Sequence, residues 1–248
     1  MSDNPVCLIQ VSHRFGEVET LRDITLTIGR NEFVALVGPS GCGKTTLLNV
    51  VSGYTTPSSG TVERPGRLRT IYQEDGLFPW LTVEKNIGLG LRGDPNTSGG
   101  TQSVSHLLTL IGLSAFARHY PHQLSGGMRQ LVELARALAG ETDLLIMDEP
   151  FSALDYLARL RMRHELARLL AERRRTVILV THDIGEAAQL ADRVIVLTER
   201  PGRVRCEINI DAPRPRSPTD PTVVNITRQV LTELGLENEG MRGRIPAV

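Results

Sequence analysis

The sequence predicts an α/β fold whose core is a mostly parallel sheet covered by helices on both faces. Short apolar runs of strand length alternate with segments of helical periodicity, the pattern of buried parallel strands joined by helical crossovers. A glycine-rich loop at residues 38–45 separates one such run from a helix. Apolar and polar side chains alternate over residues 7–37, which predicts an antiparallel β subdomain at the N-terminus.

Each element is predicted from its local pattern. Residues 32–37 form an apolar strand, and residues 44–51 form a helix that Gly53 ends. Residues 128–139 form the longest clear helix, because their apolar side chains recur at helical spacing. The other predicted elements are, in chain order, loop or edge structure at 55–66, a short strand at 71–76, a link at 93–105 leading into a helical stretch to 119, a strand at 143–147, a basic amphipathic helix at 156–174, strands at 176–180 and 193–197, and a weak helix at 222–236.

The chain length of 248 residues suits one large domain with a small lobe. We place a domain over residues 6–212, with a helical lobe at about 77–140, and a C-terminal tail over 213–248. Hydrophobic residues make up 40% of the chain, which is enough for a substantial core. No internal repeat occurs, so we expect the chain to hold a single copy of this domain.

The charge and cysteine content narrow the possible partners and location. Lysine and arginine total 28 and aspartate and glutamate total 28, so bulk charge favours neither nucleic acid nor an anionic membrane as partner. The three cysteines are scattered and form neither a disulfide framework nor a metal cluster. No apolar run approaches the roughly 20 residues that cross a bilayer, and the N-terminus lacks the layout of a secretion signal. We therefore expect a cytoplasmic protein.

Residues 38–45 fit the phosphate-loop pattern G-x-x-x-x-G-K-[ST], and their place between a strand and a helix makes the match specific. Backbone N–H groups can converge there at the positive end of a helix, which suits a triphosphate. Lys44 would reach the β- and γ-phosphates, and the Thr45 hydroxyl would complete the shell of a magnesium ion. The fold is therefore predicted to have a P-loop NTPase core. The predicted nucleotide-binding residues here are Gly38, Pro39, Ser40, Gly41, Cys42, Gly43, Lys44, Thr45 and Thr46.

The apolar run at 143–147 is followed by two carboxylates, Asp148 and Glu149. Ligands of doubly wound folds bind at the carboxyl edge of the sheet, where both would lie. Asp148 would hold magnesium through its water shell. Glu149 would polarise the attacking water as general base, an effect worth roughly 10²–10⁴-fold in rate.

A second glycine-rich segment, Ser125-Gly126-Gly127, directly precedes the long helix. Ser125 can cap that helix, and the glycines expose N–H groups at its positive end. Taken alone, the segment is a well-capped helix start. Together with the phosphate loop, it gives the chain two separate anion-binding surfaces.

These residues resemble the ATP-binding subunits of ABC transporters, and the resemblance covers residues 8–204. Residues 124–130 match the family's signature motif LSGGxxQ, which is more specific than the phosphate loop. The resemblance implies ATP and Mg²⁺ as cofactors, a helical lobe that carries the signature motif, and a homodimer in which each motif contacts ATP held by the other copy. The motif residues implied to bind this ATP are Ser125, Gly126, Gly127 and Gln130.

Further positions match the family in the expected order. Phe15 matches the aromatic residue that stacks on adenine, and Gln73 matches the glutamine that touches magnesium and the attacking water. Residues 152–155 match the loop that crosses the dimer interface, and His182 matches the histidine that contacts the γ-phosphate. The catalytic residues are thus expected to be Lys44, Gln73, Glu149 and His182, and the magnesium ligands Thr45, Gln73 and Asp148.

Two segments, 76–83 and 197–204, resemble bacterial importer ATPases for nitrate, sulfonates, taurine and similar small anions. The first lies where this family meets its membrane subunits, and exposed side chains of Leu77, Phe78 and Trp80 would suit a groove that accepts a short permease helix. The resemblance implies transmembrane permease subunits as partners and, indirectly, a substrate-binding protein. It also implies a peripheral location on the cytoplasmic face of the inner membrane.

Two other functions remain open on the sequence alone. The first is a soluble, non-transport ABC-type ATPase, although Gln73 and Ser125 lie too close together for a long coiled-coil insertion. The second is a non-enzymatic nucleotide-binding regulator, against which Glu149 and His182 both argue. A GTPase is disfavoured because the guanine-specific N-K-x-D motif is missing from the sequence.

Overall fold

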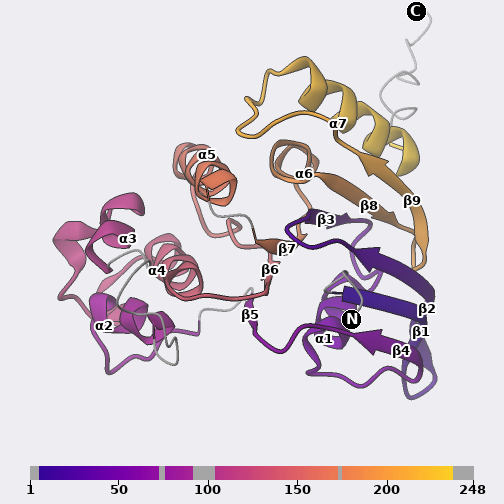
Figure 1. Cartoon of the computed structure of the whole chain (residues 1–248), viewed down its shortest axis with the longest axis horizontal. Coiled ribbons are helices and arrows are strands. Elements are labelled where there is room, and N and C mark those ends of the chain that lie inside the picture. The colour runs from indigo at the N-terminus through magenta and orange to yellow at the C-terminus, as the bar shows by residue number, and fades with distance from the viewer. Residues whose placement is uncertain (1–5, 73–75, 92–103, 173–174, 237–248) are drawn as a thin grey trace, which may run out of the picture.

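The computed structural model describes residues 6–72, 76–91, 104–172 and 175–236, and it contains two sheets (Figure 1). A three-stranded antiparallel sheet has the order β2-β1-β4, and a six-stranded sheet has the order β5-β6-β7-β3-β8-β9, with only β9 antiparallel. The strands are β1 Val6–Phe15, β2 Val18–Ile28, β3 Phe33–Val37, β4 Ser59–Glu63, β5 Leu68–Ile71, β6 Leu144–Asp148, β7 Thr176–Val180, β8 Arg193–Leu197 and β9 Val204–Asn209. The α-helices are α1 Lys44–Ser52, α2 Val83–Gly88, α3 Val104–Leu110, α4 Gly126–Ala139, α5 Tyr156–Glu172, α6 Ile184–Leu190 and α7 Pro221–Glu233. The predicted fold class is therefore confirmed.

The large sheet is buried on both faces, because a hydrophobic core covers each of them. The central strand β3 shows this, since its side chains point alternately into the two cores. Phe33, Ala35 and Val37 join the core formed with helices α4 to α7. Val34 and Leu36 join the core shared with α1 and the three-stranded sheet. A central parallel strand buried in this way reads as a continuous apolar run. The parallel pairing of β3 with β7 and β8 brings the carboxyl ends of these strands to one edge, where the site lies.

Several predicted elements agree closely with the structure. The predicted strands at 176–180 and 193–197 match β7 and β8 in both bounds. The long helix α4 begins two residues earlier than predicted, at Gly126, because Ser125 caps it. The segment predicted as loop or edge structure contains β4, which is an edge strand of the small sheet.

Other local predictions were wrong. In place of the short strand expected at 71–76, β5 spans Leu68–Ile71, the residues that pair with β6, and residues 73–75 lie outside the described part of the chain. The helical stretch expected to reach residue 119 ends at Leu110, where Gly112 adopts a left-handed φ of 70° and a 3₁₀ turn follows. Helix α6 and strand β9 were not predicted. The link expected at 93–105 lies almost entirely outside the described residues.

Helix α7 begins where the sequence provides a cap. The Asp220 side chain accepts a hydrogen bond from the N–H of Thr222 at 2.8 Å, and Pro221 occupies the first turn. The buried Val223, Ile226 and Val230 belong to the large core, and α7 packs on α6 and β9. Assigning residues 213–248 to a separate tail stays a prediction.

Candidate functional site

The phosphate loop connects β3 to α1 and closes around Lys44. The Lys44 ammonium donates hydrogen bonds to the carbonyl oxygens of Gly38 at 2.8 Å and Pro39 at 2.9 Å. Gly43 caps α1 with a left-handed φ of 104°, and a Cβ there would lie 2.8 Å from the Thr20 carbonyl oxygen. Only glycine fits this position, so the chain can turn sharply into the start of α1, an end of a helix that favours an anion.

Cys42 has a fully buried side chain, and its Sγ lies 3.8 Å from the Lys44 ammonium. This side chain belongs to the core that the loop shares with α1 and the three-stranded sheet. Arg200 is a nearby residue that the sequence reasoning missed: its guanidinium Nε donates to the Gly41 carbonyl oxygen at 3.1 Å. Arg200 lies in the segment 197–204, which resembles small-anion importer ATPases, so its position in the sequence could have indicated a functional role.

Thr45 and Asp148 meet although they lie far apart in the sequence. The Thr45 hydroxyl donates to Asp148 Oδ2 at 2.9 Å, which joins the start of α1 to the end of β6. Burial raises the pKa of the Asp148 carboxyl, and the neighbouring Glu149 raises it further, while Thr45 and Lys44 oppose the shift. A hydroxyl and a buried carboxylate side by side are the oxygen donors that Mg²⁺ takes from proteins when phosphates complete its shell, so these residues fit that ion.

Glu149 and His182 form the second pair that the structure brings together. His182 Nδ1 lies 3.0 Å from Glu149 Oε2, and the histidine side chain is 64% exposed whereas the glutamate is 20% exposed. Glu149 has a φ of 50°, a left-handed backbone conformation that costs energy for a residue with a side chain. Its N–H donates to the Val180 carbonyl oxygen at 2.9 Å, which holds this conformation beside the end of β7.

A cluster of buried charged residues holds the segment that contains His182 in place. The Thr181 hydroxyl donates to Glu186 Oε2 at 2.9 Å, and the Asp183 N–H donates to the Thr181 hydroxyl oxygen at 3.0 Å. The Arg163 guanidinium of α5 contacts the carboxylates of both Asp183 and Glu186. Burial raises the pKa of Glu186 to about 7, which Arg163 and Thr181 oppose. The sequence reasoning missed this cluster.

The second glycine-rich segment forms the start of α4. Ser125 accepts a hydrogen bond from the N–H of Met128 at 3.2 Å and so caps α4. Ser125 and Gly126 are exposed. A Cβ on Gly127 would lie 3.0 Å from the Ala153 carbonyl oxygen, so the absence of a side chain lets the loop at 152–155 pack closely.

Gln130 is buried rather than open to a ligand. Its Nε2 donates to the Glu149 carbonyl oxygen at 3.1 Å, and its Oε1 accepts from the Ala153 N–H at 3.0 Å. The residue thereby ties the α4 start to the segment after β6. A role in positioning Glu149 and the 152–155 loop fits this geometry better than direct contact with a nucleotide.

The helix starts of α1 and α4, both predicted to bind anions, lie in different parts of the molecule. Helix α1 packs on β2 and β6, whereas α4 packs on α2, α3 and β5 (Figure 1). Phe15, at the end of β1, is 56% exposed and makes an edge contact with the His13 ring at 4.5 Å between centroids. Gln73 lies outside the described residues.

Comparisons with known proteins identify the family of the chain. The ABC transporter family matches residues 21–152. The chain is 42% identical over 236 residues to the aliphatic sulfonates import ATP-binding protein SsuB 1 of Paracoccus denitrificans, covering 94% of this chain and 95% of that protein. It is 43% identical over 245 residues to the corresponding Nocardia farcinica protein, covering 98% of each. Among solved structures, the dimeric structure of MJ0796, a bacterial ABC transporter cassette, is 30% identical with a TM-score of 0.70, covering 84% of this chain and 99% of that one.

Proposed function

The chain belongs to the ABC transporter family and is one of its ATP-hydrolysing subunits, and on that premise we propose that it drives the import of small anions through a membrane permease. The observation that supports this most is the near full-length similarity to ATP-binding proteins of aliphatic sulfonate import. Sulfonates are therefore the first substrates to test, with nitrate and taurine next. The same similarity favours transport over a soluble, non-transport ATPase.

Each residue of the nucleotide site has a proposed role. Lys44 and the N–H groups of the loop bind the β- and γ-phosphates, and Phe15 stacks on adenine. Thr45, Asp148 and Gln73 would hold Mg²⁺, which would offset the charge of the phosphates.

The catalytic pair acts on the water that attacks the γ-phosphate. Glu149 accepts a proton from this water, because its carboxylate stands at the sheet edge beside the end of β6. His182, 3.0 Å from Glu149, keeps the carboxylate in place and contacts the γ-phosphate. Gln73 orients the same water.

We place the complete site between two copies of the chain. The exposed Ser125 and Gly126, with Gly127, would contact ATP bound to the phosphate loop of the partner copy, since α1 and α4 of one chain pack in different parts of the fold. The similarity to a dimeric cassette, and to a second MJ0796 structure bound to ADP and Pi at a TM-score of 0.69, supports this arrangement.

The permease would dock on the segment that follows Gln73. Phe78 and Trp80 are 41% and 69% exposed there, whereas Leu77, expected to be exposed, is buried. Among the described helices, none has the length and apolar character that spanning a membrane requires. We propose that this docking surface holds the chain beside permease subunits, at a peripheral place on the cytoplasmic face of the inner membrane. A substrate-binding protein on the other side would deliver the anion.

Glu149→Gln tests the proposed chemistry. The amide keeps the shape of the side chain but cannot accept the proton, so we expect hydrolysis to fall by roughly 10²-fold or more while ATP binding persists. ATP should then hold the variant as a dimer in sedimentation velocity. Glu141→Gln, which alters an exposed carboxylate just before β6, is the matched control and should hydrolyse ATP normally. If the Glu149→Gln protein stays monomeric at saturating ATP, this result would count against a site shared between two copies.

A further inference from the structure

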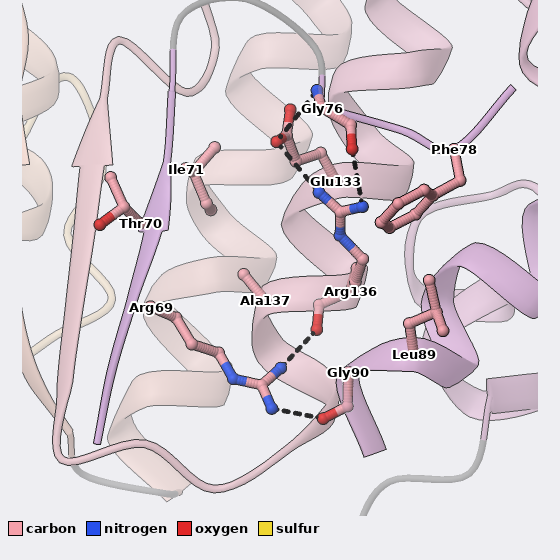
Figure 2. Close-up of a pocket in the computed structure, with 10 residues that line it drawn as sticks. All are labelled: Arg69, Thr70, Ile71, Gly76, Phe78, Leu89, Gly90, Glu133, Arg136 and Ala137. Atoms are coloured by element: carbon pink, nitrogen blue, oxygen red, sulfur yellow. Dashed lines mark hydrogen bonds and ion pairs between the residues drawn. The ribbon is translucent and has the colours of Figure 1, made fainter. Parts of the chain in front are cut away.

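A cavity of about 330 Å³ separates strand β5, helix α4 and the segment at 76–90 (Figure 2). This segment follows Gln73 in the chain and includes the proposed permease-docking residues. Two charged residues of α4, Glu133 and Arg136, line the cavity. Both form hydrogen bonds with Gly76, the first residue of this segment.

The Glu133–Arg136 pair holds the Gly76 backbone at both of its polar groups. The Gly76 N–H donates to Glu133 Oε1 at 3.3 Å, and an Arg136 guanidinium N–H donates to the Gly76 carbonyl oxygen at 2.9 Å. A second guanidinium N–H of Arg136 lies 3.3 Å from the same Glu133 oxygen. The spacing of three residues puts both side chains on one helix face. With 4% and 19% of their side chains exposed, these are partly desolvated, charge-assisted contacts.

The same pair is rigidly connected to the signature motif. Glu133 lies in the helix that Ser125 caps, seven residues beyond Gly126, which corresponds to about 10 Å along the axis. An uninterrupted helix moves as one body over this length. On the other side of the cavity, the Arg69 guanidinium of β5 donates to the Arg136 carbonyl oxygen at 3.0 Å, which adds a third element to the assembly.

Beyond Gly76, ring contacts continue toward the surface. The Arg136 guanidinium lies 5.9 Å from the centroid of the Phe78 ring, and Phe78 lies 5.4 Å from Trp80 between centroids. The Asn86 side chain accepts from the Phe78 N–H at 2.9 Å and donates to its carbonyl oxygen at 3.1 Å, which fixes that residue's backbone. Trp80 is the single tryptophan of the chain.

We propose that the Glu133–Arg136 pair is a positioning pair that couples the signature helix to the segment at 76–80, so that engagement of ATP by the start of α4 moves Phe78 and Trp80. This inference rests on the proposed function, because it needs the α4 start to contact nucleotide. In this proposal, Glu133 and Arg136 do not contact ATP. They transmit movement of the α4 start to the segment on which the permease would dock.

The fluorescence of Trp80 tests the coupling in the purified chain. In a Glu149→Gln background, ATP should change the emission of Trp80 and its quenching by acrylamide. Adding Arg136→Lys keeps the charge but removes the planar fork that reaches Gly76 and Glu133 together, so the ATP-induced change should shrink by about fivefold or more. Adding Glu133→Gln keeps an acceptor for the Gly76 N–H, so an intermediate response is expected.

Binding of a fluorescent ATP analogue and sedimentation run in parallel, and both should be unaltered by the two added changes. Arg168→Lys, in an ion pair of the same spacing on α5, is the matched control and should keep the full response. An undiminished response in Arg136→Lys would overturn the inference. The inference would also be overturned if the fluorescence of Trp80 in Glu149→Gln stayed unchanged although ATP is bound and the dimer has formed. This measurement needs no second substitution. Failure of Glu149→Gln to bind ATP at all would instead overturn the proposed function, and this inference with it.

Discussion

At the scale of single residues, Lys44 is the side chain on which the phosphate loop depends most directly. Its ammonium contacts two carbonyl oxygens of the loop, those of Gly38 and Pro39, and these contacts hold the charge at the centre of the turn. An anion that enters the loop meets this fixed charge together with the N–H groups at the start of α1.

Lys44→Ala should therefore weaken ATP binding. Charge-assisted contacts are worth on the order of 1.5–3 kcal/mol each, so we expect the dissociation constant to rise at least about tenfold. Titration with a fluorescent ATP analogue measures this change. Lys85→Ala, an exposed lysine of α2, should leave the affinity unaltered. An affinity for Lys44→Ala that stays within experimental error of the parent protein would refute the role given to Lys44.

Motif spacing predicted single residues well where the chemistry depends on a local backbone shape. Residues 38–45 form the expected loop, and Asp148 stands at the expected strand end beside Thr45. The left-handed backbone of Glu149 and the burial of Gln130 could not be predicted, because both are set by contacts between elements distant in the sequence. The special role of Glu133 could have been suspected from the sequence, because a carboxylate on the apolar face of a helix needs a polar partner.

At the scale of elements, the start of α6 places a titrating group beneath the site. Helix α6 is capped by Asp183, which accepts from the Glu186 N–H at 3.0 Å. Burial raises the pKa of Glu186 from 4.5 to about 7, with Arg163 favouring and Asp183 disfavouring its ionised form. The folded protein therefore binds this proton more tightly than the unfolded chain does.

The sign of the pH dependence follows from this difference. Below about pH 4.5 both states hold the proton, and above about pH 7 neither does, so Glu186 lowers the unfolding free energy as pH rises through this window. The loss is on the order of 3 kcal/mol. Glu186→Gln should flatten this part of the curve in urea unfolding, and Glu165→Gln on α5 should not. A wild-type slope in Glu186→Gln would contradict the assignment.

Elements were predictable to the extent that their own residues determined them. Strands β7 and β8 are continuous apolar runs buried on both faces, so their bounds could be read from the sequence. Helix α6 spans only Ile184–Leu190, too short for a helical period to emerge. Strand β9 has half-exposed and charged side chains, and it forms through pairing with β8 at the sheet edge.

At the scale of the whole molecule, the proposed mechanism makes two copies interdependent. Each chain presents a phosphate loop with the proposed catalytic carboxylate, and also presents an exposed helix start that would serve the other copy. Two ATP molecules would hold the dimer closed, and hydrolysis would open it. The Glu133–Arg136 pair would carry this movement to the segment with Phe78 and Trp80.

The most direct test of this shared site is a mixing experiment with two variants that are each inactive. Glu149→Gln lacks the base, and Ser125→Arg blocks the signature motif by its bulk and charge, yet both keep the phosphate loop. In a mixed dimer, the Ser125→Arg copy supplies an intact loop and Glu149, and the Glu149→Gln copy supplies an intact motif. ATP hydrolysis should therefore reappear on mixing, at up to about a quarter of the wild-type rate per chain, since half of randomly paired dimers are mixed and each holds one intact site. Mixtures that exchange subunits but remain inactive would contradict the account.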